Sequence, residues 1–407
     1  MKKVNLLAAA VLAAAFAMPA QADYTPNAYF NGYMRAGVGF DKNGHTNGND
    51  NVAHAVGRLG SESRVYGEIG LGADVAKVDD TVWTVNAMLA TSTDEEGSWV
   101  DNKALAFRQF NVEAKGLFDS DKDAKVWVGK KYVQREDIHI TDTYYYDISG
   151  NGAGIENVSL GAGKFSTAFV QNTNCNNIFD VRYSFPAWDG ASFQIGNTYV
   201  QQKKQNVTDN QLNGNTVTLE FTQGFNGGWN KTVFQWFKGA SAAATQVQGW
   251  NHDDRDDGNA FKLYNFGETT IVGDLKMFHQ VDYAYQKLDG DNGNNKKVKT
   301  FHAVVRPWYK LTKMTRVYVE LGSYGQYTEY DDGWKEQERM QKATLAYALT
   351  PDAGNFWSRP EIRVYTAWLH GSDKNPDNQF KKNATFSDGY RKGATDITVG
   401  VQAEAWW

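Results

Sequence analysis

The chain ends with the stretch ITVGVQAEAWW, which runs from Ile397 to Trp407. Every second residue in it is apolar: Ile397, Val399, Val401, Ala403, Ala405 and Trp407. Because successive side chains of a strand point to opposite faces, this alternation predicts a strand with one apolar face. A strand of a soluble β-sandwich could alternate in the same way. A terminal aromatic residue favours a transmembrane β-barrel, in which that ring lies at the membrane interface.

The same two-residue alternation recurs elsewhere in the chain. Each segment has an apolar face, and Tyr and charged residues take the other: Met34, Ala36, Val38 and Phe40 against Tyr33 and Arg35; Leu59, Val65, Ile69 and Leu71 against Arg58, Glu62, Tyr66 and Glu68; Val317, Val319 and Leu321 against Arg316, Tyr318 and Glu320; Ile362 and Val364 against Arg363 and Tyr365. In a barrel the apolar face meets lipid and the polar face lines a wet lumen. Arg108 shares its face with Phe110 and Val112, so we expect it to lie before a strand or at a bulge.

The N-terminus has the features of an export signal. Lys2 and Lys3 precede an apolar run that is too short to span a bilayer, and Ala20-Gln21-Ala22 provides a cleavage site. We therefore expect a signal peptide over residues 1–22 and a single β-barrel domain over residues 23–407. The remaining chain has no apolar stretch of about eighteen residues, so any membrane crossing is expected to use strands. Its length suits roughly 16 to 20 strands.

Composition narrows the functional classes. Aromatic residues make up 14% of the chain, with 39 Gly and only 7 Pro, which suits long strands with aromatic girdles and equally an acidic, β-rich secreted enzyme. The net charge is -5, or -7 once Lys2 and Lys3 are removed, and the charges are interspersed, so nucleic-acid binding gains no support. Cys175 is the sole cysteine, which excludes an intrachain disulfide; we expect a loop thiol.

Familiar catalytic and metal-binding motifs are incomplete. Residues 161–166 resemble a phosphate loop but carry Phe165 where Ser or Thr is required. The seven histidines lack the spacing of a zinc site, and the acidic run at 252–258 does not place its carboxylates as a calcium-binding EF-hand does. We therefore expect no metal and no cofactor.

Turn-rich segments fall into two length classes. The short ones are 77–80, 119–123, 186–190 and 225–228, and the long polar ones are 41–51, 202–215, 249–259, 289–297 and 371–392. A barrel with short inner turns and long outer loops has both classes.

The block from Trp127 to Gly154 mixes cations, carboxylates and aromatic residues without alternation. Two interpretations remain open for it. A glycosidase could draw an acid and a nucleophile from its carboxylates, which are Glu136, Asp137, Asp142 and Asp147. A loop folded into a pore would use the same residues to hydrogen-bond sugar hydroxyls, and its rings to stack on sugar C–H faces.

Several blocks of the sequence resemble the maltoporins. They include NGYMRAG at 31–37, RLG at 58–60, YGE at 66–68, AFR at 106–108, YYYDISG at 144–150, WSRP at 357–360 and the terminal Trp406-Trp407. The resemblance implies a homotrimer of eighteen-stranded barrels surrounded by outer-membrane lipid, which passes maltose and maltodextrins by passive diffusion. The cysteine pair that many maltoporins have in their first outer loop is missing here.

The resemblance also implies site residues. The matching aromatic slide, which guides the sugar, is Tyr33, Tyr66, Trp99, Trp357 and Trp406, with Trp99 reaching in from a neighbouring subunit and Trp250 as a further candidate ring. The matching polar tracks are Arg35, Arg58, Glu68, Arg108, Arg135 and Asp142, and Tyr144 matches the constriction. Alternation independently places Tyr33, Tyr66 and Trp406 on the charged face, and Trp357 has the parity of Arg363. A lumen arginine could instead only neutralise a facing carboxylate, and Tyr33 or Tyr66 could only fill space.

The expected function is a channel rather than an enzyme. Arg135, Asp142 and Tyr144 keep the maltoporin pattern, which favours maltodextrin over sucrose. The alternatives are a porin for sucrose or a β-glucoside, a secreted β-rich glycoside hydrolase and a soluble carbohydrate-binding module.

Overall fold

The computed structural model describes residues 26–41, 50–62, 65–92, 106–172, 176–201, 213–248, 257–289, 295–374 and 395–407. The expected signal peptide lies outside the described residues, as do Trp99, Cys175 and Trp250.

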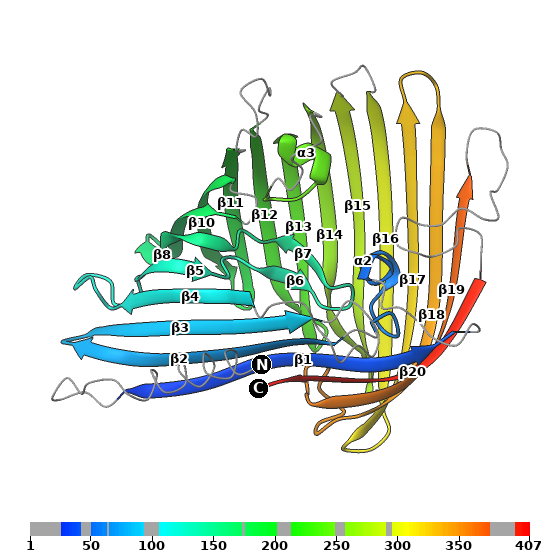
Figure 1. The fold of residues 1–407 in the computed structure, drawn as a ribbon, viewed down its shortest axis with the longest axis horizontal. Helices are drawn as coiled ribbons and strands as arrows, with labels where there is room; N and C mark the ends of the chain where they lie inside the picture. The colour runs from blue at the N-terminus through cyan, green and yellow to red at the C-terminus, as the bar shows by residue number, and fades with distance from the viewer. Residues whose placement is uncertain are drawn as a thin grey trace, which may run out of the picture.

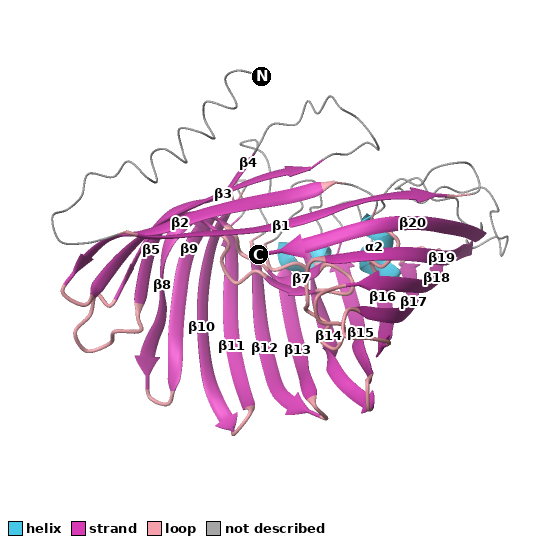
Figure 2. Ribbon diagram, turned by 90° about the horizontal axis from the view of Figure 1, so that it is seen from below, coloured by secondary structure: helices cyan, strands magenta, loops and turns pink. Residues whose placement is uncertain are grey.

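Eighteen strands form one sheet that curves around on itself (Figures 1 and 2). Their bounds are β1 (Asn27–Phe40), β2 (Tyr66–Val78), β3 (Thr81–Ser92), β4 (Ala106–Lys115), β5 (Lys125–Lys131), β8 (Gly150–Leu160), β9 (Gly163–Gln171), β10 (Asn177–Trp188), β11 (Ala191–Gln201), β12 (Gly214–Phe225), β13 (Gly228–Gly239), β14 (Asp257–Val272), β15 (Leu275–Asp289), β16 (Lys296–Lys310), β17 (Thr315–Tyr330), β18 (Lys335–Leu349), β19 (Glu361–Lys374) and β20 (Thr395–Trp406).

The sheet is closed, because its first and last strands pair with each other. β1 pairs with β2 on one side and with β20 on the other, where Tyr33 lies opposite Trp406. Neighbouring strands are antiparallel around the ring, and β5 pairs directly with β8. The prediction of an antiparallel barrel of about 18 strands is confirmed.

The two faces of the wall differ as the alternation predicts. On β20, Ile397 is 57% exposed, whereas Glu404 on the opposite face is 1% exposed. The same pattern holds on β19, where Ile362 and Val364 are exposed and Arg363 is buried. A soluble protein would bury its apolar face and expose the charged one, so this inverted pattern is that of a barrel in lipid.

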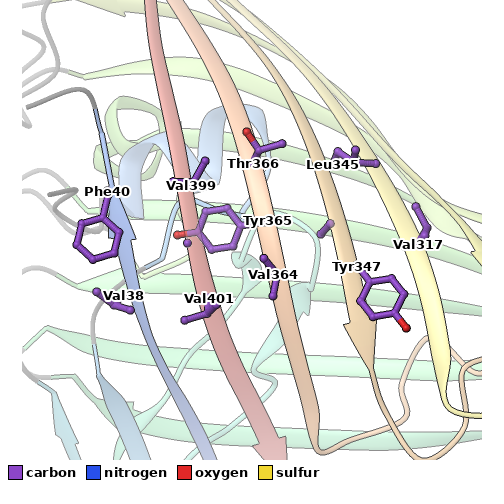
Figure 3. Close-up of a pocket in the computed structure, with 12 residues that line it drawn as sticks. Val38, Phe40, Val317, Leu345, Tyr347, Val364, Tyr365, Thr366, Val399 and Val401 are labelled. Carbon is purple, nitrogen blue, oxygen red and sulfur yellow. The ribbon is translucent and has the colours of Figure 1, made fainter. Parts of the chain in front are cut away.

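The exposed apolar face is continuous across neighbouring strands. One shallow groove in it crosses β17 to β20 and β1 and has a volume of about 550 Å³. Figure 3 shows residues that line this groove, among them Val38, Phe40, Val317, Leu345, Val364, Val399 and Val401. Aliphatic side chains at this density on an outer surface suit contact with acyl chains.

The short turns lie where the sequence predicts them. β2 and β3 are joined at 79–80, and β12 and β13 at Asn226 and Gly227. Both residues of that second turn have positive φ, 43° and 72°, which Asn and Gly adopt most readily. Most of each long polar segment lies outside the described residues.

One predicted strand is wrong. The alternation from Arg58 to Leu71 suggested a continuous strand, but β2 begins only at Tyr66. Residues Asp50–Val56 form the short helix α2, and Gly57 follows it with a φ of 101°, a left-handed conformation that ends helices. A Cβ at Gly57 would lie 2.4 Å from Glu320 on the polar face, so the chain turns against that face here. Leu59 is consequently fully buried rather than lipid-facing.

The expected irregularity at Arg108 is confirmed. Met88 pairs with Gln109 and the next residue, Leu89, pairs with Phe107, so Arg108 is the extra residue of a bulge in β4. Residues two apart in a regular strand point to the same face, and Phe110 is exposed on the apolar face. The bulge lets Arg108 turn away from that face and donate a hydrogen bond to Tyr132.

The segment between β5 and β8 leaves the wall and forms a hairpin of β6 (Glu136–Ile138) and β7 (Thr143–Tyr146). The Tyr146 hydroxyl donates to Asp180 of β10 at 2.7 Å, and Thr141 donates to Gln280 of β15 at 2.7 Å. The hairpin therefore packs against the polar face of the wall.

A second short helix, α3 (Ala240–Ala244), also lies against the wall. Gln286 of β15 donates to the carbonyl oxygens of Ala242 and Ala243. No helix among the described residues is long and apolar enough to cross a membrane.

Candidate functional site

Four of the predicted slide residues form a continuous line of rings, here called the aromatic row: Tyr66, Tyr33, Trp406 and Trp357. Successive ring centroids are separated by 5.9 Å, 6.5 Å and 6.3 Å. The four residues come from separate parts of the sequence. Tyr66, Tyr33 and Trp406 lie side by side because β2, β1 and β20 are neighbouring strands of the barrel. Strand alternation correctly placed Tyr33, Tyr66 and Trp406 on the polar face.

Trp357 joins the row for a different reason from the one its parity suggested. It lies in the turn between β18 and β19, outside any strand, so alternation does not govern it. Its backbone NH donates to the side chain of Asn355 at 2.9 Å, and its ring contacts Phe356 and Trp406. The turn, and not the strand, therefore orients Trp357.

Two further aromatic residues extend the row, and sequence reasoning missed both. Phe278 lies 6.1 Å from Trp357, and Trp229 lies 5.8 Å from Phe278 in an edge contact. Trp229 lies at the start of β13, immediately after a short turn. That position in the sequence was the available signal for an aromatic residue at the end of the row.

Glu404 is the centre of an ion-pair cluster beside the row. It accepts a hydrogen bond from the Tyr33 hydroxyl at 2.9 Å and pairs with Arg58 at 3.0 Å and Arg359 at 2.7 Å. Arg363 also pairs with it. The Arg359 guanidinium lies 4.1 Å from the centre of the Trp406 ring, so one carboxylate is linked to two rings of the row.

Two of the predicted polar-track arginines are joined through Glu62. Arg58 donates to Glu62 at 2.8 Å, and Arg35 donates to the other oxygen of the same carboxylate. Arg35 also lies 3.4 Å from Asp142. Arg58 is only 4% exposed, and its donors are shared between Glu62, Glu404 and Tyr33, so it acts as a support of the row.

The other predicted polar residues form a second cluster around Tyr132. The Tyr132 hydroxyl donates to Glu68 at 2.8 Å, and the Arg108 guanidinium donates to Tyr132 at 3.0 Å. Arg135 is stacked between two rings, because its guanidinium carbon lies 4.3 Å from the ring centres of both Tyr132 and Tyr144.

Tyr144 is the most open aromatic ring of that second cluster, with 36% of its surface exposed. It therefore presents a free aromatic surface, whereas Glu68 is buried.

His139, which sequence reasoning did not single out, connects the hairpin segment to the row. Its ring lies 5.2 Å from Trp357 and 5.7 Å from Trp406. Burial, together with the nearby Arg58, holds the pKa of His139 well below its usual value, so the ring is neutral at pH 7. A neutral imidazole can pack against rings and arginines without adding a charge.

Asp142 stays ionised beside these groups. Burial alone would raise the pKa of its carboxyl, but Arg58 and Arg35 outweigh burial and hold that pKa below its usual value. Glu136 pairs with Lys231 at 3.2 Å, and Asp147 lies 3.9 Å from Arg135. Carboxylates held in ion pairs of this kind can accept hydrogen bonds from the hydroxyl groups of a ligand. The described residues contain no group of three or more His, Cys, Asp or Glu placed to hold a metal ion.

Comparison with known proteins identifies the family. The LamB porin family model matches residues 28–407. The chain belongs to the LamB porin family. It is 36% identical to a maltoporin of Vibrio cholerae serotype O1, with all of both chains covered, and 33% identical to maltoporin 1 of Klebsiella pneumoniae, with 99% of this chain and 98% of that one covered. An anion-selective porin of Comamonas acidovorans shows a TM-score of 0.49 at 14% identity, covering 94% of this chain and 100% of that one.

This LamB porin is therefore a channel of the bacterial outer membrane and not an enzyme. The closed wall with an apolar outer face agrees with that assignment, since every backbone group of a closed barrel is paired within the lipid. The interpretation of the central block as a glycosidase site is excluded by the family.

Proposed function

We propose that this porin conducts maltose and maltodextrins by facilitated diffusion, with the sugar guided along the aromatic row. The proposal rests on the family, on two relatives named maltoporins, and above all on the unbroken line of rings from Tyr66 to Trp357. A glucose unit has an apolar C–H face that packs on such rings.

Several weak contacts in series suit transport better than one strong contact does. Each ring-to-sugar stack contributes about 1 kcal/mol, by analogy with aromatic pairs. A sugar bound to one ring can slide to the next without losing all its contacts, and it can still leave at the end. Conduction requires binding that is favourable enough to enter and weak enough to release.

The polar residues have two different roles in this proposal. Arg135, Asp142 and Tyr144 keep accessible surface and bind sugar hydroxyls, while Tyr144 narrows the passage. Arg58 and Glu68 are buried in their clusters and hold the neighbouring rings in place.

The proposal extends to features outside the described residues. Residues 1–22 are a signal peptide that is removed on export. The working unit is a homotrimer in which Trp99 of one subunit reaches into the channel of its neighbour.

Single-channel recording tests the proposal directly. The protein is inserted into a planar lipid bilayer, and maltotriose is titrated while the ionic current is measured. We expect dose-dependent and saturable block by maltotriose and much weaker block by sucrose. Replacing Tyr144 with Ala should weaken the block about 3- to 10-fold, because one aromatic contact is lost. Equal block by sucrose would instead support a sucrose porin, and no block by either sugar would reject the proposal.

A further inference from the structure

A separate cavity of about 370 Å³ borders Tyr144 on the polar face of the wall. Four parts of the chain enclose it: the hairpin segment with Asp142 and Asp147, α2 with His54, α3 with the residues that follow it, and the wall strands β14, β15 and β16. Its volume is that of a small ligand pocket. None of the rings of the aromatic row lines it.

The back of this cavity is a fixed polar framework. Gln280 donates to Asp282 at 2.8 Å and accepts a hydrogen bond from Thr141 at 2.7 Å. His302 lies 3.9 Å from Asp282, and its other ring nitrogen lies 3.3 Å from the carbonyl oxygen of Ala55. Gln280 and Asp282 are almost fully buried. Their partners hold these groups in one orientation, which is the condition for a preorganised site.

The front of the cavity offers polar groups to a ligand. Gln246, just after α3, is exposed, and Lys262 of β14 is half-buried. The Lys262 ammonium lies 4.9 Å from the centre of the Tyr264 ring, which steers it without using all three of its hydrogen-bond donors. The cavity therefore presents an amide and an ammonium at its mouth.

The charge balance of the lining favours a neutral ligand. Asp142 and Asp147 have guanidinium partners outside the cavity, in Arg35 at 3.4 Å and Arg135 at 3.9 Å. Lys262 is the only Lys or Arg among the described residues that line the cavity. A phosphate or carboxylate would meet several aspartates and a single ammonium, whereas a neutral hydroxyl can donate to the aspartates and accept from Lys262.

The lining also distinguishes this cavity from the aromatic row. Tyr264 is 1% exposed, so Tyr144 is the one open tyrosine ring, and most of the other lining residues are polar. A sugar unit would be held here by its hydroxyl edge rather than by its apolar face.

We propose that this cavity is a second sugar subsite, which binds the hydroxyl groups of a neutral sugar unit beside the constriction. The inference rests on the proposed function, because it assigns the cavity to the same class of solute. Tyr144 both narrows the passage in the proposed function and lines the cavity, so a sugar unit at the constriction lies beside this second subsite.

The test replaces polar groups at the mouth of the cavity and leaves the row intact. The variants are Gln246→Ala and Lys262→Met, singly and combined, and the control is Lys287→Met. Lys287 is exposed on β15 with the parity of Tyr283, on the opposite face of the wall. Current block by maltotriose and maltohexaose is measured in planar bilayers for each protein.

We expect the double variant to bind maltohexaose about 5- to 30-fold more weakly, since two hydrogen bonds are lost, while Lys287→Met matches the parent protein. Unchanged affinity in the double variant, with normal block of the parent, would overturn the second subsite and leave the proposed function standing. Absence of block in the parent would overturn both. Normal conductance and heat-modifiable migration of each variant in SDS gels show that it has folded.

Discussion

Trp406 is the centre of the aromatic row, with Tyr33 on one side and Trp357 on the other. We predict that Trp406→Ala weakens maltotriose block about 3- to 10-fold, because the line of stacking surfaces is interrupted. The matched control is Trp368→Ala on β19, whose exposed ring has the parity of Val364 on the outer face. An equal loss in the two variants would mean that the row has no special part in sugar binding.

Glu404 stabilises the fold, because its carboxylate pairs with three arginines and accepts a hydrogen bond from a tyrosine. We predict that Glu404→Gln lowers the free energy of unfolding by about 3–5 kcal/mol, since buried guanidinium groups lose their counter-charge. Urea unfolding in lipid vesicles measures this change. Glu329→Gln removes an exposed carboxylate 3.7 Å from Lys335 and should cost less than about 1 kcal/mol. A similarly small cost for Glu404→Gln would contradict the assigned role.

At the residue scale, prediction from sequence works where the strand itself orients the side chain. Alternation placed Tyr33 and Trp406 correctly, because their direction follows from the backbone. It could not reveal that Arg359 lies over Trp406 or that Phe278 and Trp229 extend the row. Those contacts join parts of the chain that are distant in sequence, and they depend on how the barrel closes.

At the element scale, alternation succeeds because the wall is one strand thick, and every residue therefore faces either lipid or the polar interior. It fails where the chain leaves the wall. The segment from Arg58 to Glu62 has the apolar spacing of a strand, but α2 and Gly57 turn it against the polar face. The bulge at Arg108 could be anticipated, since an arginine in an apolar register requires a local irregularity.

The apolar face of β20 gives a depth-dependent prediction. Val399→Arg puts a charge on the lipid face in the middle of the strand and should cost about 2–4 kcal/mol of unfolding free energy. Thr395→Arg has the same parity but lies at the end of the strand, where the expected cost is about 0–1 kcal/mol. Urea unfolding in lipid vesicles compares the two. Equal costs would show that this face does not lie in a membrane.

At the scale of the whole molecule, the subunit assembly is open to a simple test. We predict that the purified porin migrates in SDS gels as a trimer when unheated and as a single chain after boiling, because a closed barrel resists detergent. Migration as a single folded chain in unheated samples, with chemical cross-linking also yielding no trimer, would rule out the homotrimer.

Sequence length and strand period predicted the size of the barrel, because each strand and its turn need a similar number of residues to cross the lipid. They could not predict the interior, which depends on where the hairpin β6–β7 and α3 pack against the wall. The cavity beside Tyr144 is formed where these elements and α2 meet the wall.

The central claim is that the closed wall encloses a path for a neutral sugar. Swelling of liposomes in isotonic maltotriose tests it most directly, because swelling requires the sugar itself to cross the membrane. We predict rapid swelling of liposomes that contain the porin, with a rate that saturates as the maltotriose concentration rises, and slow swelling in raffinose, a trisaccharide of different shape. Swelling in maltotriose no faster than in protein-free liposomes would contradict the account.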